Sequence, residues 1–139
     1  MPARNSLAST SKPVDEKITI NIGCIDLGQI DLLVQEGFYA NRTDLIRTAI
    51  RNQLTTHAEA VREVVTRKTL VLGIQHYAAA DLQAVKDAGA RLQIKVLGLA
   101  TIAADVTPRL ALATIESLTV LGALHASPAV KAALRDRIN

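Results

Sequence analysis

A short alternating segment constrains the fold of this chain more than any other feature. Residues 16–23 have the sequence EKITINIG, in which Ile18, Ile20 and Ile22 alternate with Lys17, Thr19 and Asn21. A period of two with β-branched residues predicts a strand with one apolar and one polar face. The segments that follow look helical, so this strand has no neighbour nearby in its own chain. A second copy of the same strand is the partner that we expect.

Two helices are predicted directly after this strand. In residues 26–36 apolar side chains share one face, and Gly37 follows where a helix would end. Asn41 is a good N-cap for the next helix, and Asp44 suits the positive end of its dipole. The apolar stripe of this second helix consists of Leu45, Ile46, Ala49, Ile50 and Leu54. The order strand, helix, helix therefore spans residues 15–57.

The second half of the chain contains a repeated motif. Val-Leu-Gly occurs at residues 71–73, 96–98 and 120–122, at spacings of 25 and 24 residues. A strand-like run leads into each motif and a helix-like stretch follows it, with Pro108 and Pro128 at helix starts. This recurrence predicts three parallel strands with helices on one side, either as a short solenoid or as a compact α/β domain. The open sheet edges favour association with another copy.

The predicted chain is thus of mixed α/β class and has four parts. They are a flexible arm at 1–14, a strand-helix-helix unit at 15–57, a connecting helix at 58–68 and a β-α repeat domain at 69–139.

Composition excludes several functional classes. Of 139 residues 49% are apolar, but only Phe38, Tyr39 and Tyr77 are aromatic, which argues against single-stranded nucleic acid as a ligand. The single cysteine, Cys24, permits neither an internal disulfide nor a cysteine zinc cluster. No apolar run is long enough for a membrane span or a secretory signal, so a cytoplasmic protein without a membrane partner is expected. No nucleophile elbow, phosphate-binding glycine loop or HExxH pair is present, so we expect no enzyme activity and no cofactor.

The order KITINIG, helix, Gly37-Phe38-Tyr39-Ala40-Asn41-Arg42-Thr43-Asp44, then LIRTAIR resembles the ribbon-helix-helix family of DNA-binding regulators, the CopG/MetJ/Arc class. The resemblance covers about 40 residues. It implies an intertwined homodimer whose two strands form an antiparallel ribbon in the major groove of double-stranded DNA. The implied dimer core contains Ile18, Ile20, Ile22, Leu27, Ile30, Ile46 and Ile50.

The resemblance also implies which residues contact DNA. Lys17, Thr19 and Asn21 take the base-contacting positions, and lysine suits guanine while asparagine suits adenine. The start of the second helix is expected to bind a phosphate, with Asn41, Arg42 and Thr43 beside it. Arg47 either reaches a phosphate or pairs with Asp44. Residues 1–57 carry six basic and six acidic side chains, which predicts a shallow salt dependence of binding.

The extra residues beyond the resemblance imply a second role. Oligomerisation of a transcriptional repressor is the first interpretation, and effector or metal sensing is the alternative, because nickel-responsive regulators share this layout. His76 and His125 each follow a repeat glycine by three residues, and Thr101 holds the equivalent place. If the strands stack in order, the two histidines lie about 9–10 Å apart, too far for one metal within a chain. An antitoxin, or a plasmid partition or transfer protein, would share the same DNA-binding chemistry.

Overall fold

The structure is a computed structural model that describes residues 15–139. The arm expected at residues 1–14 lies outside this range. The described chain divides into two compact units, residues 15–64 and residues 65–139. The first contains α2 (Cys24–Gln35) and α3 (Arg42–Thr56), and α4 (Ala58–Arg67) crosses the boundary between the units. No helix in residues 15–139 is long and apolar enough to cross a membrane.

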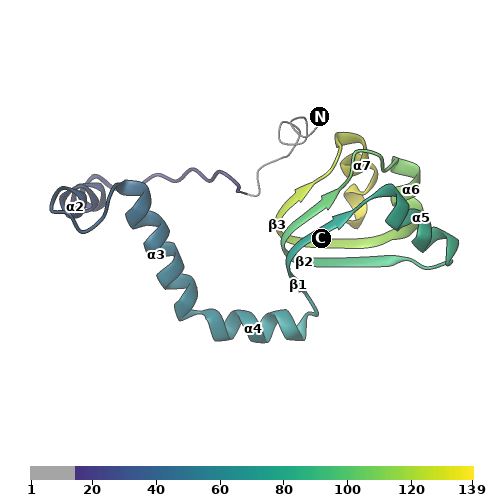
Figure 1. Cartoon of the computed structure of the whole chain (residues 1–139), viewed down its shortest axis with the longest axis horizontal. Helices are drawn as coiled ribbons and strands as arrows, with labels where there is room; N and C mark the ends of the chain where they lie inside the picture. Colours follow the sequence, from purple (N-terminus) through teal and green to yellow (C-terminus); the bar gives the residue numbers. More distant parts are fainter. Residues whose placement is uncertain (1–14) are drawn as a thin grey trace, which may run out of the picture. The chain divides into compact units, whose positions relative to one another are not determined.

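The segment expected to be a strand, residues 16–23, forms no strand in the single chain (Figure 1). A strand exists by hydrogen bonding to a neighbour, and residues 15–64 contain no other strand to supply one. All residues from 15 to 23 are exposed. The two-stranded ribbon therefore stays a prediction that needs a second chain.

The second unit contains a three-stranded parallel sheet in the order β1-β2-β3, as the repeated motif predicts. Its strands are β1 (Val71–Tyr77), β2 (Leu92–Ile102) and β3 (Ile115–His125). The helices α5 (Ala79–Asp87), α6 (Pro108–Thr114) and α7 (Pro128–Ala133) follow them in turn, and a 3-10 turn spans Arg135–Arg137. The helices lie on one side of the sheet (Figure 1).

Three glycines fix the register of this sheet. Gly73 pairs with Gly98 and Gly98 with Gly122, and their φ angles are 125°, 138° and 122°. A Cβ on Gly98 would overlap the carbonyl oxygen of Gly73, and a Cβ on Gly122 would overlap that of Gly98. Only glycine permits both this φ and this close approach of neighbouring strands.

The strands continue past these glycines, and this corrects the sequence interpretation. His76 and His125, which each follow a repeat glycine by three residues, both lie inside strands and share a row with Thr101. The row itself is confirmed. Glycine inside a strand usually weakens it, so each strand was expected to end near its glycine, whereas here the glycine permits the strand to continue.

The core of the second unit lies between the sheet and its helices. The fully buried side chains include Leu82, Ile94, Ile115, Leu118 and Leu134. The end of the chain covers part of the β3 edge, since Ile138 bridges to Leu118 and the Asn139 amide donates to the Leu118 carbonyl at 2.8 Å. Within residues 15–139, no strand pairs with the outer edge of β1.

Candidate DNA interface

The helix α3 begins as its sequence predicts. Asn41 is the N-cap, and its Oδ1 accepts a hydrogen bond from the Asp44 amide at 2.8 Å. The Asp44 carboxylate in turn accepts from the Ala40 amide at 2.9 Å. Two backbone amides at this end of the helix thus have acceptors, and the Asp44 carboxylate also interacts favourably with the positive end of the helix dipole.

A bidentate ion pair joins α3 to α2. The Arg42 guanidinium donates from Nε to Asp31 Oδ1 at 2.7 Å and from its terminal nitrogen to Oδ2 at 2.8 Å. The hydrogen bond from Arg42 lowers the pKa of Asp31, and the same bond raises the pKa of Arg42. The side chain of Arg42, a residue expected to lie beside a phosphate, therefore links the two helices.

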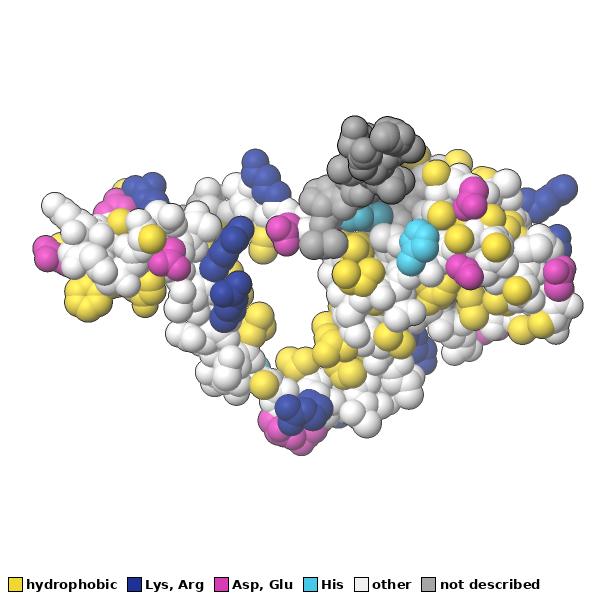
Figure 2. All heavy atoms as spheres, viewed as in Figure 1, with side chains coloured by type: hydrophobic (Ala, Val, Ile, Leu, Met, Phe, Trp, Pro, Cys, Tyr) yellow, Lys and Arg dark blue, Asp and Glu magenta, His cyan; other side chains and the backbone are white. Residues whose placement is uncertain are grey.

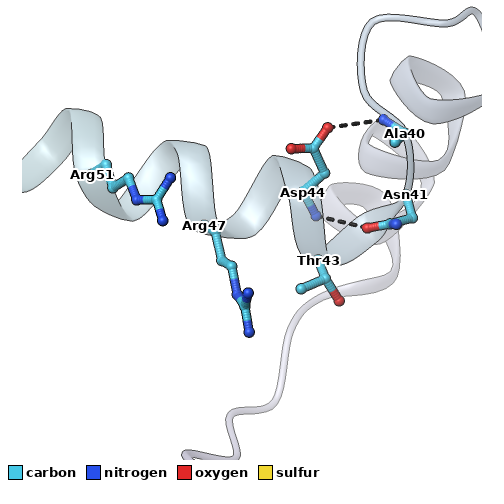
Figure 3. A pocket seen from close by; sticks show the side chains of 6 residues that line it. All are labelled: Ala40, Asn41, Thr43, Asp44, Arg47 and Arg51. Atoms are coloured by element: carbon cyan, nitrogen blue, oxygen red, sulfur yellow. Dashed lines mark hydrogen bonds between the residues drawn. The ribbon is translucent and has the colours of Figure 1, made fainter. Parts of the chain in front are cut away.

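An open hollow lies beside this helix start. It is lined by Ala40, Asn41, Thr43, Asp44, Arg47 and Arg51 (Figure 3). Thr43 and Arg47 extend from the same side of α3, with Arg51 one turn further along. Basic side chains also gather along α3 in the space-filling view (Figure 2). The hollow combines a helix N-terminus with two guanidinium groups, which suits an anion.

The structure decides one alternative about Arg47. Its suggested pairing with Asp44 is not found within residues 15–139, where Arg42 pairs with Asp31 and Arg62 with Glu59. Asp44 instead accepts the hydrogen bond from Ala40. Arg51 was not predicted as a contact, although its spacing of four residues from Arg47 places both on one flank of a helix.

The expected dimer core is not buried in the single chain. No residue between 15 and 64 is buried. The isoleucines of the predicted ribbon are 83%, 76% and 45% exposed at positions 18, 20 and 22. Ile46 and Ile50 are also exposed, and Leu27 and Ile30 are only partly covered. Apolar side chains are visible at the surface of this unit in Figure 2.

The polar face of the predicted ribbon is also exposed to solvent. Lys17, Thr19 and Asn21 are all exposed, and none of them has a hydrogen-bond partner within residues 15–139. Glu16, which precedes them, does have an interaction.

Residues 13–131 match the family described as the ribbon-helix-helix transcriptional regulator family. The chain belongs to this family. The match spans both units of this regulator, so the sheet as well as the helices lies within it. Searches of curated proteins and of solved structures found no match. Membership makes the chain a DNA-binding transcriptional regulator with a mixed α/β fold.

The histidine row provides no metal site on its own. His76 Nδ1 lies 2.5 Å from Thr101 Oγ1, and His125 also has an interaction. Within the described residues no three His, Cys, Asp or Glu side chains come together as metal ligands. Cys24 is exposed at the first residue of α2.

Proposed function

We propose that this regulator is a homodimeric repressor that inserts a two-stranded ribbon into the major groove of its operator. Residues 16–23 of two chains form the ribbon. Lys17, Thr19 and Asn21 contact base edges from its polar face. The observation that carries the proposal is the absence of any buried residue in the unit 15–64, although its apolar side chains follow regular strand and helix patterns. Such a unit needs a second copy to form its core.

The hollow at the start of α3 is the proposed phosphate site. The amides of Arg42 and Thr43 donate to no acceptor within residues 15–139, so they are available to a phosphate oxygen. Thr43 and Arg47 are further proposed contacts of this site, and Arg51 is added to them. Asn41 and Arg42 act by positioning, because their side chains are used by the cap and by the ion pair with Asp31.

The β-α repeat domain, residues 69–139, is the proposed oligomerisation domain. Joining dimers that occupy adjacent sites would tighten the binding of such a repressor to its promoter, because binding of the second dimer then becomes intramolecular.

The test is selection of genomic DNA fragments by the purified full-length protein and by Asn21→Ala. Loss of a bidentate contact from Asn21 is expected to cost about 1–3 kcal/mol at one base position. The matched control is Asn52→Ala, which removes another exposed asparagine, from α3 outside the ribbon. Promoter fragments with a repeated half-site, weakened only by Asn21→Ala, would support the proposal. Absence of enrichment, or enrichment that Asn21→Ala leaves unchanged, would contradict it.

A further inference from the structure

One face of the parallel sheet is not covered by any helix or strand of residues 65–139. The side chains of three consecutive rows point away from α5, α6 and α7, and none of them belongs to the core beneath those helices. We call this surface the open face. It consists of Leu72, Leu97 and Leu121, then Ile74, Leu99 and Ala123, then His76, Thr101 and His125.

The open face is apolar and exposed. Leu72 is 68% exposed, Ile74 61% and Leu121 54%, whereas Leu99 in the central strand is buried. On the opposite face Ile94, Val96 and Leu118 are almost completely buried by the helices. Parallel sheets are nearly always covered on both faces, so this exposed apolar surface predicts a further layer.

Charge favours a second copy as that layer. None of the nine positions is Asp, Glu, Lys or Arg. A charged partner would lose solvation on this surface without gaining an ion pair. The same face of a second copy would instead cover it with leucine and isoleucine rows of matching size.

The size of the open face determines how many chains assemble. Three strands at about 4.8 Å and three rows at about 7 Å give a footprint of about 300 Å² per chain. A single contact between two open faces buries less surface area than a stable dimer requires. Two such contacts between the same pair of ribbon dimers bury about 1,200 Å², which is the lower limit for specific interfaces.

We propose that the open face of each chain packs against the open face of a chain from a second ribbon dimer, so that the regulator is a tetramer. The proposal rests on the ribbon dimer proposed above and names the surface by which two dimers join. Two apolar sheets stack face to face at about 10 Å, with the leucine and isoleucine rows between them.

The test is the mass of the full-length protein in solution, measured by sedimentation over a range of concentrations. Wild type is expected to be a tetramer, and Leu121→Asp a dimer, because a carboxylate cannot be buried between apolar rows without a partner. Ile74→Asp repeats the test from another strand. The matched control is Leu112→Asp, which places the same charge on an exposed leucine of α6, on the helical side of the sheet. Circular dichroism confirms that each variant is folded.

Each alternative mass pattern has its own meaning. A wild-type dimer that Leu121→Asp leaves unchanged would overturn the open-face proposal and leave the ribbon proposal standing. A tetramer that survives both Leu121→Asp and Ile74→Asp would also overturn it, and would place the contact elsewhere, such as at the open edge of β1. If Leu121→Asp gave monomers, the open face would be an interface but the ribbon dimer would be wrong.

Discussion

The arginines of α3 divide into two kinds by their partners. Arg42 is committed to Asp31, whereas Arg47 and Arg51 line an open hollow without an ion pair in the described residues. Exposed ion pairs contribute little to stability, so Arg42 matters mainly because its two hydrogen bonds set the approach of α2 and α3.

We expect Arg47→Ala and Arg51→Ala each to weaken binding to all DNA sequences about equally. Each should also reduce the slope of log affinity against log salt by about 1, because one phosphate contact is lost. The measurement is a titration of operator and unrelated DNA at several salt concentrations. Arg62→Ala, which removes an exposed arginine of α4 paired with Glu59, is the control and should leave the slope unchanged. An unchanged slope for both α3 variants would remove the hollow from the interface.

The Asp31 carboxyl should titrate at a lower pH than its ordinary 3.8, because Arg42 hydrogen-bonds to its charged form. Because the pKa of Asp31 is lower in the folded than in the unfolded state, the ion pair stabilises the fold at any pH above the unfolded-state pKa. This stabilisation is lost as the pH falls through the folded-state pKa. NMR titration of Asp31 is expected to show a rise of its midpoint in Arg42→Ala, but not in Arg47→Ala. An identical midpoint in wild type and Arg42→Ala would show that the ion pair is absent in solution.

Side-chain interactions could be predicted from the sequence where both partners lie within a few residues of each other in the chain. The Asn41 cap is such a case, because the partner amide lies three residues away. The pairing of Arg42 with Asp31 could not be predicted, since the two residues are 11 positions apart and meet only after α2 and α3 have packed.

Among the elements, the glycine row decides whether the sheet can form. Gly98→Ala is expected to lower the free energy of unfolding of the second unit by at least about 3 kcal/mol, because it adds backbone strain and a steric overlap with the Gly73 carbonyl. Thermal or chemical unfolding measures the effect.

Gly73→Ala is the matched control for this substitution. Gly73 has a similar φ, but a Cβ on this residue would meet no atom within 4 Å, so only the backbone strain of about 1–3 kcal/mol remains. Equal losses of stability for the two variants would show that close approach between strands is unimportant.

The order of the elements could be predicted, but their ends could not. Parallel strands followed from the 25- and 24-residue spacing of Val-Leu-Gly, whereas the continuation of each strand through its glycine depends on contacts with the next strand. The strand expected at residues 16–23 shows the same dependence, because its proposed partner belongs to another chain.

At the scale of the whole molecule, the two units differ in where their cores come from. The unit 65–139 contains its own buried cluster, while the unit 15–64 has no buried residue. Stability of the unit 15–64 should therefore depend on protein concentration. Hydrogen exchange in α2 and α3 is expected to accelerate on dilution, while exchange in β2 stays slow. Exchange in α2 and α3 that does not change on dilution would contradict the ribbon dimer.

The glycine row also has a consequence for how the chain finds its fold. Three strands with the same Val-Leu-Gly motif allow many wrong alignments during folding, since a strand can shift along its neighbour and still bury apolar side chains. The close approach at Gly98 and Gly122 removes most of them, because a slipped strand would bring a side chain against a neighbouring carbonyl. We therefore expect the glycine in each strand to favour the correct alignment of this repetitive sequence over slipped alignments.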